Sequence, residues 1–158
     1  MTSTMTTEPT QARRSKIVSA GEGKTLNVFG VRVEVLLTGE DTAGQFCSYE
    51  CIVEPGAGAP PHVHSHDDET FYILEGTFEV LMGETVVTAR AGDIAHLPRG
   101  LAHTFKNIGE TTGRFVGTAT PAGHEHFFED ADALGRSGEF TPEKAIEMCR
   151  RHGLELLI

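Results

Sequence analysis

The chain has 158 residues, with 13 lysines and arginines against 23 aspartates and glutamates, and its formal net charge is −10. This length is enough for one domain that buries a proper core without disulfides. The strong negative charge makes nucleic acids and anionic membranes poor partners, and we expect neither.

The beginning of the chain, residues 1–16, is polar, rich in threonine and without an apolar run. We expect these residues to form a disordered tail and not a signal peptide. No stretch approaches the roughly 18 apolar residues of a membrane-spanning helix. Cys47, Cys51 and Cys149 lack a CxxC spacing, and their odd number favours reduced, buried thiols. Together these features predict a cytoplasmic protein.

Short apolar segments separated by turn residues dominate the chain from residue 17 to residue 121 and predict a β-rich domain. The expected strands lie within residues 26–38 (two strands about a turn), 46–53, 71–74, 77–82, 85–89, 94–97, 102–107 and 114–120. Residues 39–44 are rich in Gly, Asp and Thr and are expected to form a loop. About ten short strands with no helix among them require a closed or double-sheet antiparallel structure, and the jelly roll is one such structure.

The character of the sequence changes after residue 121. Residues 123–134 predict a short helix, and the Thr141–Pro142 pair predicts the N-cap and first residue of a second helix that ends at Gly153. The apolar residues 154–158 are expected to dock as a last strand. We therefore divide the chain into a tail (1–16), a β-barrel domain (17–121) and a C-terminal helical extension that packs on the barrel (122–158).

Two segments, 56–76 and 92–107, contain histidines at spacings that favour metal binding. His62 and His64 are two residues apart, so on a strand their side chains project from one face, about 6.6 Å apart along the chain. Glu69 follows after a polar turn and His103 lies in a later strand, so both can reach the same point. Three imidazole nitrogens and one carboxylate oxygen form a site for a divalent transition metal and normally leave coordination positions free.

Both segments match the two motifs of the cupin family. The first runs from Gly56 to Gly76 as Gly, five residues, His-x-His, four residues, Glu, six residues, Gly. The second runs from Gly92 to Asn107 as Gly, five residues, Pro-x-Gly, two residues, His, three residues, Asn. The chain therefore resembles a small single-domain cupin. The runs LTGEDTAGQF and PPHVHSHDDETFYILEG are similar to the subgroup that includes quercetin 2,3-dioxygenase.

The resemblance implies an all-β protein, a double-stranded β-helix or jelly-roll barrel with a short C-terminal helical segment. It implies that His62, His64, Glu69 and His103 hold one divalent transition metal (Fe, Mn, Ni, Cu or Zn). Glu69 is expected to be either a permanent ligand or a general base toward the substrate, with a proton affinity raised by an apolar wall. Small cupins commonly form homodimers through sheet edges, and the N-terminal strands and residues 154–158 are expected to cover such edges.

Residues with the right strand parity are expected to line a substrate pocket beside the metal, although plain core packing is the alternative for each. They are Tyr49, Phe71, Ile73, Phe78, His96 and Phe105. If His96 faces inward, it could donate a hydrogen bond to a metal ligand or act as a proton shuttle near neutral pH, but a hydrogen-bonded wall residue is the slightly preferred interpretation. Phe127 and Phe128 are expected either to cover the pocket mouth or to fix the helix to the sheet.

The remaining histidines and two acidic residues fit solvated positions. His66, Asp67 and Asp68 have the composition of a solvated turn, and a His64-x-His66 register would leave too few residues before Glu69. His124 and His126 form a second His-x-His without a partner motif, so we expect an exposed loop or lid.

A site of this composition suits oxygenation of a chelating substrate, or Lewis-acid stabilisation of an enolate. The first hypothesis is a metal-dependent dioxygenase that resembles quercetin 2,3-dioxygenase and acts on a small aromatic or enolic substrate, such as a flavonol, a catechol or a polyketide-like compound. The second is a non-oxidative cupin: a cyclase, an isomerase or a decarboxylase. The third is a small-molecule or metal-binding module without turnover. No Arg or Lys pair is evident in the barrel strands, since Arg90, Arg99 and Arg114 look peripheral.

Overall fold

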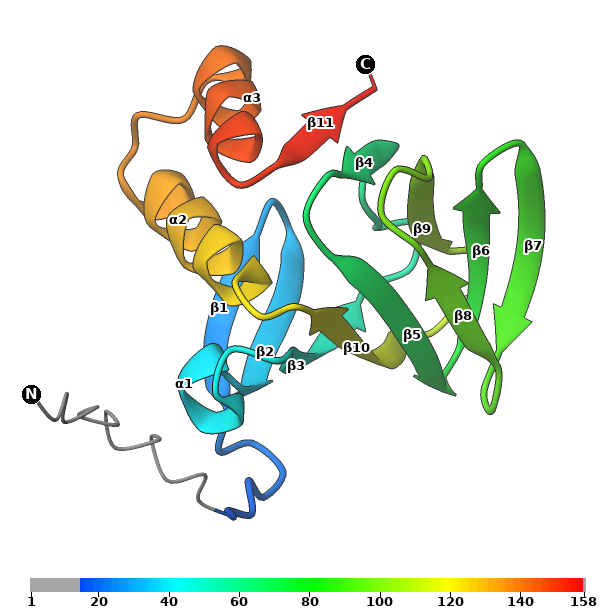
Figure 1. Cartoon of the computed structure of the whole chain (residues 1–158). Helices are drawn as coiled ribbons and strands as arrows, with labels where there is room; N and C mark the ends of the chain where they lie inside the picture. Colours follow the sequence, from blue (N-terminus) through cyan, green and yellow to red (C-terminus); the bar gives the residue numbers. More distant parts are fainter. Residues whose placement is uncertain (1–14, 158) are drawn as a thin grey trace, which may run out of the picture.

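The computed structural model describes residues 15–157, so the expected tail lies almost entirely outside the described residues (Figure 1). Within these residues the fold is all-β, with two antiparallel sheets that face each other and three helices. The six-stranded sheet has the order β1-β2-β3-β10-β5-β8 and consists of Lys24–Val28, Val31–Leu37, Cys47–Val53, Gly113–Thr120, Asp68–Glu75 and Ile94–Leu97. The five-stranded sheet has the order β11-β4-β9-β6-β7 and consists of Leu154–Leu156, His62–His64, His103–Asn107, Thr77–Met82 and Thr85–Arg90.

The core lies between the two sheets, as the alternation of the central strands shows. In β3 and β10 every second residue is buried, and these residues face the opposite sheet. Phe115 of β10 is fully buried and contacts three rings, Phe71, Phe78 and Phe105, at centroid distances of 4.4, 5.5 and 5.0 Å. This cluster of phenylalanines fills the barrel on one side of the histidine site. Cys47, Cys51 and Cys149 are free and buried, as predicted.

The helices gather at one side of the barrel, next to β1, β2 and β11 (Figure 1). The second helix, α2 (His124–Arg136), packs on β1, where the Asp132 carboxylate accepts a hydrogen bond from the backbone N–H of Asn27 (2.8 Å). The third, α3 (Pro142–Arg151), begins as predicted: the Thr141 hydroxyl accepts from the backbone N–H of Lys144 (3.2 Å). None of the helices within residues 15–157 has the length and apolar character that crossing a membrane requires.

The structure contradicts one local prediction and confirms another. Residues 39–44 were expected to be a loop, but Gly39–Thr42 form a single helical turn, α1. Asp41 stabilises this turn because its carboxylate accepts from the backbone N–H of Thr38 (2.9 Å), an N-terminal cap that short polar runs readily form. The expected last strand is present as β11, which pairs antiparallel with β4 and sets Leu154 opposite His64. The C-terminal segment thereby becomes part of the sheet that carries the three histidines of the site, His62 and His64 on β4 and His103 on β9.

Candidate metal centre

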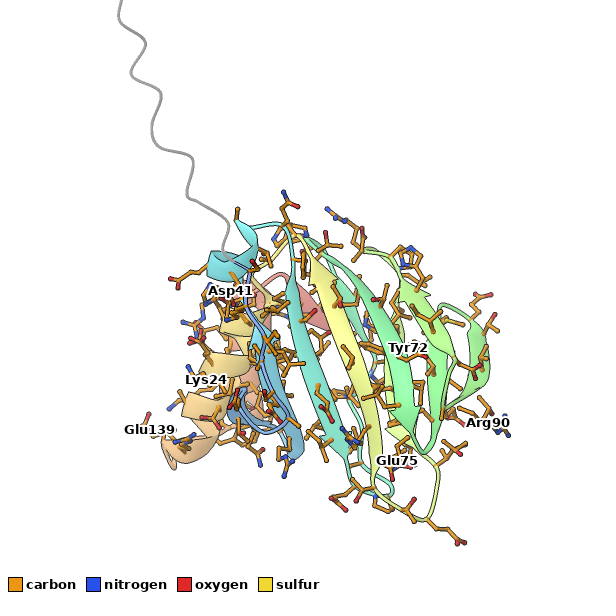
Figure 2. All side chains as sticks on the ribbon, turned by 90° about the horizontal axis from the view of Figure 1, so that it is seen from below. Lys24, Asp41, Tyr72, Glu75, Arg90 and Glu139 are labelled. Carbon is orange, nitrogen blue, oxygen red and sulfur yellow. The ribbon has the colours of Figure 1, made fainter. Side chains whose placement is uncertain are left out.

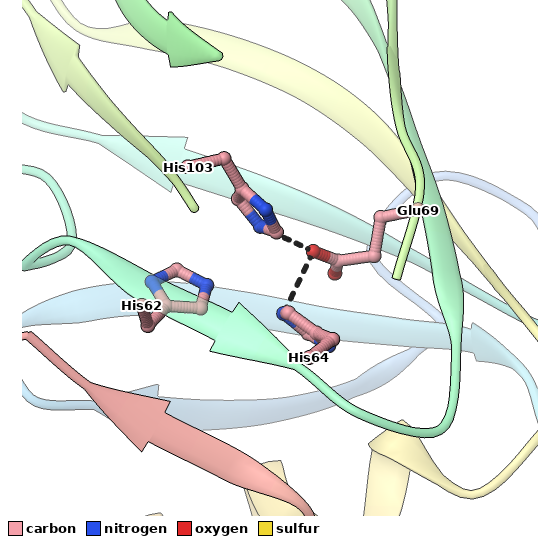
Figure 3. Close-up of side chains that lie close together, drawn as sticks. All are labelled: His62, His64, Glu69 and His103. Carbon is pink, nitrogen blue, oxygen red and sulfur yellow. Dashed lines mark hydrogen bonds and ion pairs between the residues drawn. The ribbon is translucent and has the colours of Figure 1, made fainter. Parts of the chain in front are cut away.

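The four predicted ligands converge between the sheets, and their ligand atoms all lie within 4.8 Å of one another (Figure 3). His62 and His64 project from β4, and His62 is the cross-strand partner of His103 on β9. Glu69 reaches them from β5 in the opposite sheet, and its Oε2 lies 3.1 Å from Nε2 of both His64 and His103. His64, Glu69 and His103 are buried and His62 is partly exposed. The cluster is therefore largely buried, and His62 is its most accessible member.

The three imidazoles are oriented by oxygen atoms outside the cluster. Nδ1 of His62 lies 2.7 Å from the carbonyl oxygen of Pro60, and Nδ1 of His103 lies 3.3 Å from that of Leu101. Nδ1 of His64 donates to the Asp67 carboxylate at 2.9 Å. A carbonyl can only accept, so Nδ1 carries the proton in His62 and His103, and Nε2 faces the cluster. Metal-binding histidines are commonly held in this way.

One atom of the cluster lacks a partner. Nε2 of His64 is close to Glu69 but not in hydrogen-bonding geometry, and among residues 15–157 it is the single buried side-chain nitrogen or oxygen with no hydrogen bond. Buried polar atoms are usually satisfied, so an unpaired one that points into a group of ligands calls for a partner. The donor set of three imidazoles and one carboxylate fits a divalent transition metal, and this cluster could hold one.

The charges of the site favour a cation at its centre. Burial raises the pKa of Glu69, but the imidazoles of His64 and His103 outweigh burial and bring the pKa well below its ordinary value. The expectation of a raised proton affinity was therefore wrong, because imidazoles and not apolar groups dominate the surroundings of the carboxylate. Burial lowers the pKa of His64, but the carboxylates of Glu69 and Asp67 outweigh it and raise the pKa to about 10. Burial and the neighbouring His103 lower the pKa of His62 to about 4. His64 is therefore protonated beside Glu69 and Asp67 at neutral pH in the absence of a metal.

Tyr49 holds the second oxygen of Glu69. It extends from β3, and its buried hydroxyl donates to Oε1 of the carboxylate. The ring passes over Gly117 of β10, where a Cβ atom would lie 2.2 Å from it, so only glycine leaves room for this contact. Burial, together with the Glu69 charge, raises the pKa of Tyr49 well above its ordinary value, and the phenol stays a donor.

His124 is a member of the site that the sequence interpretation missed. It was expected in an exposed loop, but it is the first residue of α2, is buried, and places Nε2 3.5 Å from Oε1 of Glu69. Its ring lies 4.8 Å from that of His64, and His64, Asp67 and His124 form a second group of ligand types. The available signal was the helical period, because His124, Phe127, Phe128 and Ala131 share the buried face of α2. His126 lies on the exposed face of α2.

The turn after His64 is only partly solvated. Asp67 was expected to be exposed, but it is buried, and its carboxylate accepts a hydrogen bond from Nδ1–H of His64. Asp68 lies outside the cluster and forms an ion pair with Arg99 (3.0 Å), and His66 is exposed. Asp67 is therefore the residue that orients a ligand, whereas its neighbours remain at the surface.

A cavity of about 290 Å³ lies beside the cluster, between the barrel and the two long helices. Of the predicted pocket residues, Tyr49, Phe71 and Phe105 line it, together with His62, Glu69 and His124. The other three do not line it. Ile73 and Phe78 are buried deeper in the barrel beside Phe115, and His96 is exposed. The inward residue of β8 is Leu97, which pairs with Glu69, so strand alternation turns His96 outward.

The fold and the site define a class of protein: a double-sheet antiparallel barrel with three histidines and one glutamate gathered inside it. Residues 49–121 match the cupin domain family, and these residues contain both histidine segments. The chain belongs to the cupin superfamily.

Known relatives resemble only part of the chain. It is 32% identical over 89 residues to Protein SchB of Streptomyces halstedii, a match that covers 55% of this chain and 64% of the relative. It is 30% identical over 70 residues to the polyketide synthase CurC of Streptomyces cyaneus, with 44% of this chain and 46% of the relative covered. The chain thus spans about half to two thirds of the length of these relatives. A predicted oxalate decarboxylase from Thermotoga maritima, 24% identical, superposes with a TM-score of 0.62 over 67% of this chain and 99% of its own, and shares the fold.

Proposed function

We propose that this protein is a metal-dependent enzyme that acts on a small, uncharged aromatic or enolic substrate, with dioxygenation as the reaction. The observation that supports the proposal is the position of the cluster. His62 and Glu69 belong both to the group of four ligands and to the wall of the apolar cavity. A substrate in the cavity would therefore present its oxygen atoms directly to the metal position.

His62, His64, Glu69 and His103 would hold the metal, which would supply Lewis acidity or one-electron chemistry when bound. Glu69 is ionised at neutral pH because of its low pKa, as a general base must be. Its Oε1 is held by Tyr49 while its Oε2 faces the imidazoles, so the carboxylate is positioned to accept the hydroxyl proton of a substrate that enters from the cavity. The phenyl rings of Phe71 and Phe105 would exclude water and orient an aromatic substrate.

A second candidate is non-oxidative cyclisation of a polyketide-like enol by the same residues. It is favoured by the similarity to CurC, which is described as a polyketide synthase. In this reaction Glu69 would remove a proton from carbon or oxygen, and no O₂ would be consumed. The site chemistry serves both reactions, because the deprotonated hydroxyl group of a flavonol or catechol and the enolate of a polyketide-like compound are both anions that a cation stabilises.

Oxygen uptake distinguishes the candidates. The protein is loaded separately with Fe, Mn, Ni, Cu or Zn and mixed with flavonols, catechols and polyketide-like enols, while dissolved O₂ and substrate loss are followed together. Equal loss of O₂ and substrate is expected for the dioxygenase. Substrate loss without O₂ consumption would refute dioxygenation and support the non-oxidative reaction. Binding of the compounds without turnover would indicate that the protein is a binding module and not an enzyme.

A further inference from the structure

The cavity faces solvent at a pair of phenylalanines from distant parts of the chain. Phe29 lies at the tip of the β1–β2 hairpin, and Phe140 lies in the connection between α2 and α3. Both line the cavity, and they are 41% and 49% exposed, unlike the buried rings farther inside. Their ring centroids are 5.8 Å apart with an edge-on orientation, and Phe29 also lies 6.4 Å from Phe127. These two side chains therefore form the outer wall of the cavity.

Phe29 occupies a backbone position that disfavours it. Val28 pairs with Val31, so the hairpin loop consists of Phe29 and Gly30 alone, with φ values of +51° and +93°. Two-residue loops with positive φ at both positions strongly prefer Asn or Asp followed by Gly, because most side chains are strained there. The Asn27 side chain partly compensates, since it accepts from the backbone N–H of Gly30 (2.9 Å). A large aromatic residue at an unfavourable φ is a reason to look for a role of the ring itself.

A row of rings connects this outer wall to the candidate metal centre. From Phe127 the centroid distance to His124 is 5.3 Å, from His124 to Phe128 it is 4.5 Å, and from Phe128 to Tyr49 it is 4.8 Å. Tyr49 and His124 both contact Glu69. The polar groups of the cavity are thus concentrated at its inner end.

The side chains that line the cavity limit the charge of the ligand that can bind there. Among the residues of the described chain that line the cavity there is no lysine or arginine. Arg99 pairs with Asp68 and Arg114 pairs with Glu50 (2.6 Å), whereas Arg32 and Arg136 line a separate pocket that also includes Phe29 and Phe140. A dianionic substrate would therefore enter a cavity whose lining offers it no lysine or arginine, and burial of its unpaired charges would cost free energy. An uncharged ring system would bury apolar area there. At about 290 Å³, the cavity is at the lower end of small-molecule sites, which suits a compact ligand.

We propose that the Phe29–Phe140 pair forms the apolar subsite that selects the substrate: it recognises the uncharged ring portion of a compact ligand whose polar end reaches His62 and Glu69. The strained position of Phe29 fits this role, because its ring closes the subsite. This assignment rests on the proposed function, because it takes the cavity as the substrate site. Binding of the ring to Phe29 and Phe140 can nevertheless be measured without turnover.

The test is calorimetric titration of the full chain, without metal and loaded with Zn²⁺, using 1-naphthol, which is uncharged at neutral pH, and oxalate as a compact dianion. One 1-naphthol is expected to bind per chain in both forms, and oxalate is expected not to bind the metal-free form. Phe29→Asn and, independently, Phe140→Ala should weaken 1-naphthol binding about 3- to 10-fold, the size of a lost aromatic contact. Phe29→Tyr should keep most of the affinity. Phe29→Asn should not lower the melting temperature, because Asn suits the positive φ.

The matched control is Tyr72→Asn, since Tyr72 is a similarly exposed ring (46%) on the outer face of the six-stranded sheet, away from the cavity (Figure 2). Its substitution should leave 1-naphthol binding unchanged. Wild-type affinity in both Phe29→Asn and Phe140→Ala, an equal loss in Tyr72→Asn, or oxalate binding to the metal-free form as tight as that of 1-naphthol would each overturn the subsite. Binding that depends on Phe29 in a protein with no turnover would instead sustain the subsite and refute the enzymatic function.

Discussion

The role of Glu69 separates an enzyme from a binding protein, and Glu69→Gln tests it. The amide keeps the shape of the side chain and one oxygen. If that oxygen faces His64 and His103 in place of Oε2, the NH₂ group points toward the Tyr49 hydroxyl, which can rotate and accept. The substitution therefore removes the negative charge and the proton acceptor without requiring a change in packing.

The expected magnitude follows from the loss of the base. At saturating metal, turnover should fall on the order of 10²–10⁴-fold, because a positioned general base contributes about that factor. The metal affinity should also fall, because a neutral oxygen replaces a carboxylate, so the metal content must be measured beside kcat. The pKa of His64 should fall from about 10, since the Glu69 charge is the main group that raises it. NMR titration of the metal-free variant would show this change.

Asp67→Asn is the matched control. It also removes a buried carboxylate next to His64, but from the outer side of the imidazole. It should weaken metal binding about 10- to 100-fold, as loss of an orienting partner does, and should keep most of the turnover once the metal is saturating. If Glu69→Gln retains wild-type kcat at full metal occupancy, or if Asp67→Asn loses as much, the general-base role is wrong and Glu69 is only a ligand.

Four further predictions concern the metal, pH, packing and assembly. Elemental analysis should find close to one divalent metal per chain, and full occupancy in the His62→Ala, His64→Ala double variant would contradict the ligand assignment. Because the pKa of His64 is about 10 in the absence of metal, metal binding near neutral pH should release one proton, and the apparent affinity should rise about tenfold per pH unit from about pH 7 to 9. Because the pKa of His64 is raised in the folded, metal-free protein, its contribution to the free energy of unfolding is complete below the unfolded pKa of about 6.5 and is lost as the pH rises through 10. Both statements depend on the raised pKa of His64, so a metal affinity that does not change with pH would contradict them. Gly117→Ala places a Cβ atom in the Tyr49 ring and should destabilise the fold by about 1–3 kcal/mol in denaturant unfolding, whereas an unchanged midpoint would show that Tyr49 is free to move. We expect a homodimer of about 34 kDa by light scattering, twice the 17.1 kDa of one chain, because β1, β7, β8 and β11 end the two sheets and exposed edges tend to pair; a monomer at micromolar concentration would end this expectation.

The strands and the four clustered ligands could be predicted because the signals are local. An HVH segment on a strand points two imidazoles to one face whatever surrounds it, and alternation in the β3 and β10 segments is visible in the sequence. The turn residues between the strands were equally informative. His96 shows the limit of such reasoning: periodicity tells which residues share a face, but the pairing of Leu97 with Glu69 decided which face of β8 is inside.

The sequence by itself determined the fold class and the two histidine segments, because these depend on strand parity and spacing over a few residues. The grouping of His103 with His62, His64 and Glu69 was predicted from the resemblance to the two cupin motifs. Only the tertiary structure decided that α2 folds back over the barrel and brings His124 to 3.5 Å from Glu69, 55 positions earlier in the chain. It also decided that Asp67 is buried against His64, and that Phe29 meets Phe140 at the outer wall of the cavity. These contacts depend on which surfaces the helices cover, and local spacing can show that a helix has a buried face but not which distant sheet that face packs against.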